Sequence, residues 1–257
     1  MNATPDILSF CDVTKSFGGI TALDRCSFSV RRHAIEGIIG PNGAGKTTIF
    51  NLATGVHSPN SGTIEFAGVA LTPTSSRPDA LVRRGIARTF QNLRLFASET
   101  VLEHVLVAQN ARLPFVQRLL PLRHDDALAA RARSLLEFTG LWGERDRLAT
   151  ALSYGGQRHV EIARALATEP KLLLLDEPVA GMNAQEASDM RELLLRIRDR
   201  GVTVLLIEHD MPFVMELCDR LHVLDFGSLI ADGTPAQVRR DPGVLRAYLG
   251  DEAPLRA

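Results

Sequence analysis

The feature that most constrains the fold of this chain is a glycine-rich segment between an apolar run and a helical pattern. Residues 40–47, GPNGAGKT, fit the pattern GxxxxGK(S/T) at every position. The run Ile35–Ile39 before it predicts a strand, and residues 47–54 predict a helix. A strand, a glycine-rich turn and a helix in this order direct backbone N–H groups at a polyphosphate. We therefore expect a phosphate-binding loop on an α/β core.

The residues of this loop have different expected contacts. We expect Lys46 to reach the β- and γ-phosphates of ATP, and the Thr47 hydroxyl to bind Mg²⁺. The glycines let backbone N–H groups converge on the phosphates. The expected nucleotide-binding residues of this segment are Gly40, Pro41, Asn42, Gly43, Ala44, Gly45, Lys46, Thr47 and Thr48.

Two adjacent carboxylates follow a second apolar run. Asp176 ends the run 172–175, and Glu177 comes directly after it. A carboxylate at the carboxyl end of a buried strand lies on the ligand side of an open α/β sheet. We therefore expect Asp176 to hold Mg²⁺, mostly through water. Glu177 is expected to act as a general base toward an attacking water, although by itself it also fits a solvated acid beside Pro178.

The order of strand and helix patterns indicates the fold class. Residues 7–17 and 26–40 predict strands, with a turn at Gly18 and Gly19. Residues 79–167 are mostly helical, beginning with an expected helix over 79–87, and two apolar strands then alternate with helices. This order predicts an α/β fold with a parallel sheet, and the helical stretch is too long for one crossover.

A phosphate loop on such a sheet resembles the P-loop NTPases, and this resemblance implies a RecA-like core with an N-terminal antiparallel β subdomain and an inserted α-helical subdomain. All of it is expected to be one domain over residues 1–257. Residues 1–90 would form a β-rich part with the phosphate loop, 91–168 a mostly helical lobe with a further motif, and 169–257 the remainder of the core with a C-terminal segment.

Composition excludes several other classes of protein. The chain has 29 Lys and Arg against 30 Asp and Glu. It therefore has no strong positive electrostatic field that would favour binding to nucleic acid, and no nucleic-acid partner is expected. The apolar runs fall far short of the roughly 20 residues of a membrane span, and the N-terminus has no pattern of a secretory signal. Cys11, Cys26 and Cys218 have no metal or disulfide spacing and are expected to be reduced thiols.

Further motifs carry a resemblance to a known family. Residues 152–157, LSYGGQ, are similar to the LSGGQ signature of ATP-binding cassette (ABC) ATPases. Gln91 in RTFQN resembles the Q-loop, His209 in IEHD the switch histidine, and Phe17 the aromatic that stacks on adenine. Residues 180–183, AGMN, resemble the D-loop. With the phosphate loop and the acidic pair, these motifs stand in the family's order over nearly the whole chain.

The resemblance implies that two such domains bind head to tail, with ATP between the phosphate loop of one and the signature loop of the other. It implies that Ser153 and Gly155 contact the γ-phosphate of ATP bound to the partner. It also implies that His209 contacts the γ-phosphate and that Gln91 senses Mg²⁺ or the attacking water. Taken singly, these residues also fit ordinary structural roles: Gln91 a loop amide, Ser153 a helix N-cap, Phe17 a core residue and His209 a solvated strand end.

The sequence departs from the family pattern at three positions. Tyr154 replaces the usual glycine of the signature, and Gly156 stands at its fifth position. Asn183 stands in the D-loop where many ABC ATPases have Asp, so no charge-dependent role is expected there. Glu177 is intact, which argues against a cassette that binds ATP without hydrolysing it.

Longer stretches resemble the ATPase subunits of bacterial branched-chain amino-acid importers, among them residues 85–110 and 231–252. This implies an energy-coupling subunit on the cytoplasmic face of the bacterial inner membrane. Its implied partners are a second, different ATPase, two transmembrane permease subunits and, indirectly, a solute-binding protein. Residues 112–126, RLPFVQRLLPLRHDD, resemble an insertion of those subunits, and fit either a contact with the permease or an ordinary amphipathic surface.

Three alternatives compete with this interpretation. The chain could be the ATPase of a lipopolysaccharide exporter, to which the phosphate loop and the C-terminal YLGD are also similar. It could serve an importer of another small polar solute, such as urea or an amide. A soluble ABC ATPase of DNA repair or translation is disfavoured, because such proteins usually carry tandem cassettes or long coiled coils.

Overall fold

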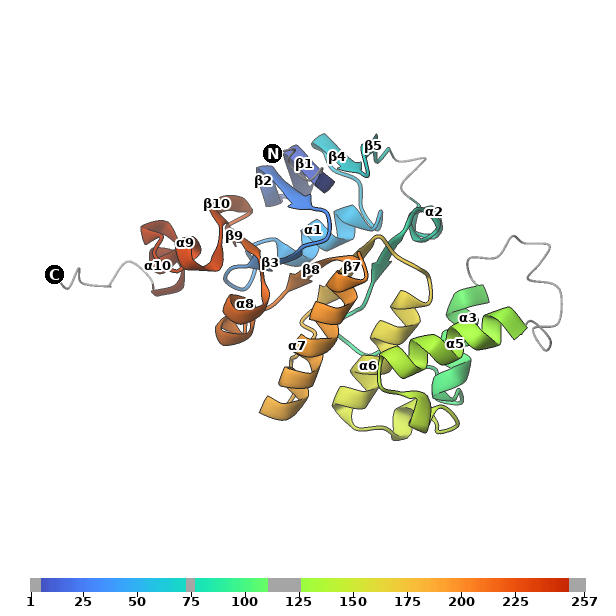
Figure 1. Cartoon of the computed structure of the whole chain (residues 1–257). Coiled ribbons are helices and arrows are strands. Elements are labelled where there is room, and N and C mark those ends of the chain that lie inside the picture. Colours follow the sequence, from blue (N-terminus) through green and yellow to red (C-terminus); the bar gives the residue numbers. More distant parts are fainter. Residues whose placement is uncertain (1–5, 73–76, 111–125, 250–257) are drawn as a thin grey trace.

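Two β-sheets and a group of helices make up the part of the chain that this computed structural model describes, residues 6–72, 77–110 and 126–249 (Figure 1). The strands are β1 (Asp6–Phe17), β2 (Ile20–Arg31), β3 (Ile35–Ile39), β4 (Ser61–Phe66), β5 (Val69–Ala70), β6 (Ile86–Arg88), β7 (Leu172–Asp176), β8 (Thr203–Ile207), β9 (Arg220–Asp225) and β10 (Ser228–Gly233). The helices are α1 (Lys46–Ala53), α2 (Pro78–Arg84), α3 (Val101–Asn110), α5 (Asp126–Phe138), α6 (Tyr154–Leu166), α7 (Ala184–Asp199), α8 (Met211–Leu217), α9 (Pro235–Val238) and α10 (Pro242–Leu249), with short 3-10 turns at Trp142–Glu144 and Ala149–Ala151.

The larger sheet has the strand order β10-β9-β3-β8-β7-β6. Its strands pair in parallel from β9 through β6, and β10 is antiparallel to β9. Every residue of β3, β7 and β8 is buried, because helices or the second sheet cover both faces. The predicted parallel strands are confirmed, and so is the fold class.

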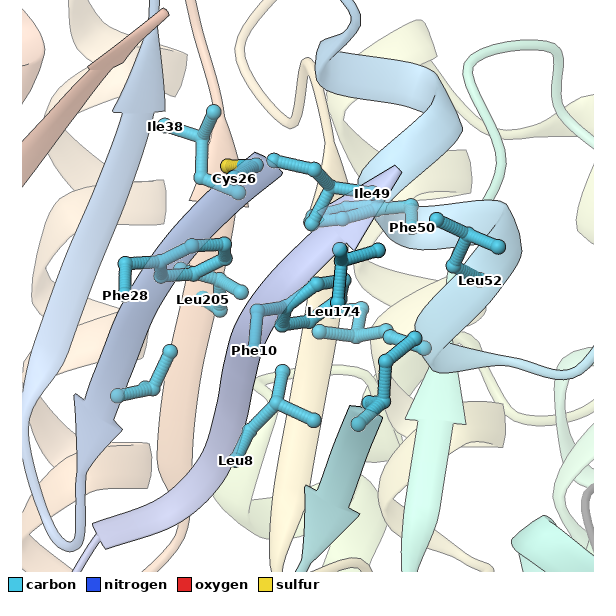
Figure 2. Close-up of a cluster of buried hydrophobic side chains, with 14 of the residues drawn as sticks. Leu8, Phe10, Cys26, Phe28, Ile38, Ile49, Phe50, Leu52, Leu174 and Leu205 are labelled. Carbon is cyan, nitrogen blue, oxygen red and sulfur yellow. The ribbon is translucent and has the colours of Figure 1, made fainter. Parts of the chain in front are cut away.

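The smaller sheet, of order β2-β1-β4-β5, is antiparallel and packs over one face of the larger sheet, with α1 between them. Figure 2 shows Phe10 and Phe28 of the smaller sheet with Phe50 of α1 and Leu174 and Leu205 of the larger sheet. Burying an aromatic or aliphatic side chain of this size is worth about 1.5–3 kcal/mol. This shared core holds α1, and therefore the loop before it, in a fixed position.

The opposite face of the larger sheet is covered by α7 and α8. Leu173 and Leu206 point to this face, whereas Leu174 and Leu205 point to the other, because side chains alternate along a strand. Met190 of α7 packs in the same cluster. The sheet therefore has two apolar faces, as its continuous apolar runs predict.

The helical lobe consists of α3, α5 and α6, and it has a hydrophobic core of its own. Val105 of α3, Leu136 of α5 and Val160 of α6 are each completely buried in it. Figure 1 shows these helices beside the end of the sheet that carries β6, away from the antiparallel sheet. Residues 112–125 of the proposed insertion lie outside the described residues.

The expectation of one helix over 79–87 is wrong. Helix α2 ends at Arg84, Gly85 caps it in the left-handed conformation with φ 104°, and β6 begins at Ile86. β6 then pairs in parallel with β7 and forms an edge of the larger sheet. Two basic residues followed by glycine are a helix C-terminal signal, and here it separates a helix from a strand.

Candidate active site

Four neighbouring parallel strands deliver the candidate residues to one edge of the sheet. β3 leads into the phosphate loop, residues 40–47, and β8 leads to His209. β7 ends at Asp176, and β6 is followed by Gln91. Because parallel strands place their carboxyl ends at the same edge, segments far apart in the sequence meet there.

The backbone of the phosphate loop is fixed by close packing. Gly45 has φ 103°, and a Cβ atom there would lie 2.5 Å from the carbonyl oxygen of Ala22. At Gly40, a Cβ atom would lie 2.1 Å from the carbonyl oxygen of Leu224. Both positions therefore require glycine. No side chain caps the N-terminus of α1, so its first N–H groups are available to an anion.

Lys46 lies over this loop. Its Nζ donates hydrogen bonds to the carbonyl oxygens of Gly40, at 2.7 Å, and Pro41, at 2.8 Å. Burial lowers the pKa of Lys46, and the charges of Glu177 and Asp176 act against this shift. The ammonium group is thus held beside the two carboxylates at the end of β7.

Asp176 is buried and paired with Arg88, a residue that the sequence analysis did not single out. Arg88 Nη2 donates to Asp176 Oδ2 at 3.1 Å, and both side chains are more than nine-tenths buried. Burial raises the pKa of Asp176, and the hydrogen bond and charge of Arg88 oppose the rise. The partner was missed because the sequence analysis assigned residues 86 and 87 of β6 to the end of a helix and quoted Arg88 only as part of RTFQN.

Glu177 is placed between two of the expected catalytic side chains. Gln91 Nε2 donates to Glu177 Oε2 at 2.9 Å, and His209 Nδ1 lies 3.7 Å from Glu177 Oε1. The Glu177 backbone has φ 48°, a left-handed conformation that is uncommon for residues other than glycine. Its N–H donates to the carbonyl oxygen of Ile207, which holds this conformation against β8.

Glu208 is a further residue that the sequence analysis missed, although it stands in the quoted IEHD. Its carboxylate is completely buried and accepts hydrogen bonds from the N–H groups of Val179 and His209, each at 3.0 Å. Burial raises the pKa of Glu208, and these N–H groups oppose the rise. Glu208 thereby joins the segment after Glu177 to the backbone of His209.

A cavity of about 330 Å³ lies over these strand ends. It is lined by Ala22, Asn42, Gly43, Ala44, Gly45, Lys46, Thr47, Thr48, Gln91, Asp176, Glu177 and Ile207. The hydroxyl of Thr47 and the carboxylate of Asp176 are the hard oxygen donors that Mg²⁺ prefers. They are too few for a complete protein cage, which suits an ion that keeps several waters and binds phosphate oxygens. The residues present therefore fit Mg²⁺ together with a polyphosphate.

The structure places the remaining expected residues outside this lining. Phe17 ends β1, where its ring packs edge-on against His57 and below Lys15. Ser153 is the N-cap of α6 and accepts a hydrogen bond from the N–H of Gly156 at 3.2 Å.

Gly155 packs against Glu186 of α7, where a Cβ atom would lie 2.8 Å from Glu186 Oε1. Gly40 and Pro41 precede the lined part of the phosphate loop, and His209 reaches the site through Glu177.

The chain is similar to known proteins over almost its whole length. The family description "ABC transporter" matches residues 23–180, and "Branched-chain amino acid ATP-binding cassette transporter" matches residues 228–254. The chain is 41% identical to the high-affinity branched-chain amino acid transport ATP-binding protein BraF of Pseudomonas aeruginosa, over 95% of this chain and 98% of that protein. It is 36% identical to the lipopolysaccharide export system ATP-binding protein LptB of Haemophilus influenzae, over 97% of this chain and 99% of that protein.

The fold is similar to that of a solved cassette. The crystal structure of the ADP conformation of an ATP-binding cassette of an ABC transporter matches with a TM-score of 0.86 and 35% identity, over 96% of this chain and 100% of that one. Within the described residues, none of the helices has the length and hydropathy of a membrane span.

Proposed function

This chain belongs to the ABC transporter ATP-binding family, and from that premise we propose that it is the energy-coupling subunit of an importer of branched-chain amino acids. It is a nucleotide-binding, transport-coupled ATPase. The observation that supports a hydrolytic role is the position of Glu177 at the cavity, with Gln91 at 2.9 Å and His209 at 3.7 Å.

The proposed chemistry assigns a separate role to each group. The N–H groups at the start of α1 and the Lys46 ammonium bind the phosphates of ATP. Glu177 accepts a proton from the attacking water, while Gln91 and His209 orient that water and the carboxylate. Thr47 and Asp176, with Gln91 beside them, would hold Mg²⁺, which when bound neutralises charge on the phosphate oxygens.

The proposed dimer supplies the other part of the site. In a head-to-tail pair, Ser153 and Gly155 of one chain contact the γ-phosphate of ATP bound to the partner, and Phe17 stacks on the adenine. The N-terminus of α6 suits this contact because a helix N-terminus favours an anion. ATP then supplies contacts that the closed pair has and the open pair lacks, so binding shifts the equilibrium toward closure.

The transported solute is assigned from the C-terminal segment and from the relatives. Residues 228–254 match the branched-chain family description, and the relative named for branched-chain transport is more similar, at 41%, than the one named for lipopolysaccharide export, at 36%. We propose a peripheral location on the cytoplasmic face of the bacterial inner membrane. The proposed partners are a second, different ATPase, two permease subunits and, indirectly, a solute-binding protein.

Uptake of labelled leucine tests the function. Cells that lack this gene are supplied with the wild-type chain, with Glu177→Gln or with Glu169→Gln at equal expression. Glu169 is a matched control, because it is an exposed glutamate with a similar left-handed backbone, φ 47°, outside the site. Wild type and Glu169→Gln should restore uptake, and Glu177→Gln should not. Leucine uptake that is unaffected by loss of the gene would contradict the assigned solute, and urea, amides and lipopolysaccharide export would then be measured.

Composition of the complex tests the partners. After gentle extraction from the membrane, mass spectrometry should find one copy of this chain with one copy of a different ATPase. A complex that contains two copies of this chain and no second ATPase would refute the proposed heterodimer.

A further inference from the structure

Arg158, which directly follows the signature residues 152–157, is a buried arginine that the catalytic roles above do not use. It lies on α6 with its side chain 3% exposed. Nη1 donates to the carbonyl oxygen of Phe90 at 2.8 Å and to Glu161 Oε2 at 2.9 Å. Nη2 donates to the carbonyl oxygen of Gln91 and to the Tyr154 hydroxyl, the latter at 3.0 Å. The four N–H bonds of the two terminal nitrogens thus have four partners.

These partners belong to separate motifs. The carbonyl oxygens of Phe90 and Gln91 fix the backbone from which the Gln91 amide reaches Glu177. Tyr154 stands in the signature loop, and its ring lies close to the D-loop, since a Cβ atom on Gly181 would lie 3.7 Å from it. A continuous series of contacts therefore runs from the signature loop through Arg158 to Gln91 and Glu177.

The geometry of the guanidinium group allows Arg158 to bind these partners at the same time. Its donors lie in one plane and point in fixed directions, so a single side chain can bind two successive carbonyl oxygens while it pairs with Glu161. Lysine keeps the charge that Glu161 requires, but it offers three N–H bonds from one point. A lysine at 158 should therefore keep the ion pair and lose the hold on the backbone of residues 90 and 91.

We propose that Arg158 is a positioning residue for ATP hydrolysis, which fixes Gln91 against Glu177 and joins this pair to the signature loop of the same chain. The inference rests on the proposed roles of Gln91 and Glu177 and on the head-to-tail dimer. In that dimer the signature loop contacts the partner's ATP, so Arg158 connects occupancy of one site to the alignment of the base in the other.

A double-mutant cycle in the full-length chain tests this role. We compare ATP hydrolysis and ATP binding for wild type, Arg158→Lys, Gln91→Ala and the double variant. Arg158→Lys should lower kcat about tenfold, because a displaced catalytic group costs rate more than binding, while KM for ATP stays nearly constant. In the Gln91→Ala background the same substitution should have almost no further effect, since contacting residues that act together are not additive.

Arg164→Lys is the matched control. Arg164 lies on the same helix, donates to one carbonyl oxygen, that of Arg94, at 2.5 Å, and also lies 3.8 Å from Glu161 Oε1. One carbonyl contact and one ion pair are within reach of lysine, so kcat should be retained. If Arg158→Lys does not fold, Tyr154→Phe removes one of the four partners, and should lower kcat in wild type but not in Gln91→Ala.

The possible results distinguish a failure of the role proposed for Arg158 from a failure of the catalytic roles on which it rests. An equal fold-loss in both backgrounds, or an unchanged kcat in Arg158→Lys, would overturn the role of Arg158 and leave the catalytic assignments intact. If Gln91→Ala and Glu177→Gln themselves hydrolyse ATP at the wild-type rate, the proposed roles and the inference are both wrong.

Discussion

The phosphate loop and the signature loop both precede a helix, but the two helix N-termini are capped differently. Helix α1 begins after Gly45, and no side chain caps it. Helix α6 begins after Ser153, whose hydroxyl already accepts the N–H of Gly156. The N-terminus of α1 therefore has N–H donors available to a ligand in this chain's cavity, whereas the N-terminus of α6 is capped by Ser153.

The surroundings of the phosphate loop and of the signature loop also differ. The phosphate loop is anchored in the core that Figure 2 shows, and its cavity also contains the acidic residues of β7. The signature loop lies on the helical lobe, against Glu186 of α7, and does not line that cavity. The difference fits the proposal that the phosphate loop binds ATP within this chain, whereas the signature loop contacts ATP bound to a partner. Four predictions can break or sharpen this contrast.

Glu177→Gln should have the largest effect. Removing a general base typically costs about 10²–10⁴ in rate, while the phosphate contacts of Lys46 and the loop remain. Single-turnover hydrolysis should therefore fall steeply, and ATP binding measured by titration should be retained. Glu169→Gln, measured in parallel, should hydrolyse ATP normally. A Glu177→Gln chain that hydrolyses ATP within threefold of wild type would assign the base elsewhere.

Lys46→Ala should act on binding instead of on the chemical step. A hydrogen bond to a charged group is worth about 1.5–3 kcal/mol, so the Kd for ATP should rise about ten- to a hundredfold. Equilibrium titration of the isolated chain measures this directly. If Lys46→Ala and Glu177→Gln lost ATP binding equally, the division of roles within the phosphate site would be wrong.

Ser153→Ala should leave ATP binding by the isolated chain unchanged. Loss of the N-cap should lower the free energy of unfolding by about 1 kcal/mol. Thr234→Ala is the matched control, because Thr234 caps α9 in a capping box and lies outside both loops. In the assembled complex, hydrolysis should fall in Ser153→Ala more than in Thr234→Ala. Weakened binding of ATP by the isolated Ser153→Ala chain would remove the contrast between the loops.

The smallest expected effect is on the pH dependence of folding stability. It should have opposite signs at His222 of the larger sheet and at His104 of the helical lobe. His222 lies in β9, next to the strand β3 that leads into the phosphate loop. Its side chain is completely buried, with Nε2 2.9 Å from Glu36 Oε2 and Nδ1 3.3 Å from Asp232 Oδ1. Burial disfavours charge on the ring, but the two carboxylates raise its pKa above the ordinary 6.5. Its contribution to stability is therefore present below about pH 6.5 and is lost as the pH rises through the folded pKa.

His104 of the helical lobe should behave in the opposite way. Its Nδ1 lies 2.8 Å from the carbonyl oxygen of Thr100, and its Nε2 accepts the N–H of Phe96 at 2.9 Å, which requires the neutral ring. Burial lowers its pKa below 6.5, so its contribution is present above that pH and is lost as the pH falls toward the folded pKa. Denaturant unfolding between pH 5.5 and 8.5 should show His222→Gln losing most at low pH and His104→Gln losing most at high pH. The same pH trend in both variants would contradict the assignment.

The regular parts of the fold were predictable from the sequence because local patterns determine them. The strand Ile35–Ile39 and the two buried runs of the parallel sheet are confirmed. Each depends on a run of apolar residues within a few positions. The sequence motifs also identified Gln91, Glu177 and His209, and the structure places Gln91 at 2.9 Å and His209 at 3.7 Å from the Glu177 carboxylate.

The partners of the site residues could not be predicted in the same way. Arg88 pairs with Asp176 across 88 positions of sequence, and the short strand β6 that carries it has only three residues. Glu208 and Arg158 act through backbone groups of distant segments, and a backbone group leaves no residue-type signal in the sequence. Pairings that depend on the relative placement of two elements become visible only once the fold has brought those elements together.

The left-handed backbone of Glu177 has a consequence for protein engineering. A side chain in this conformation costs on the order of 1 kcal/mol, a strain that glycine does not bear and asparagine bears more easily. A screen of variants for heat resistance alone would therefore favour glycine or asparagine at position 177. These variants would be more stable but would lack the carboxylate proposed to activate water. Selection for a more stable chain therefore has to include ATP hydrolysis at every round.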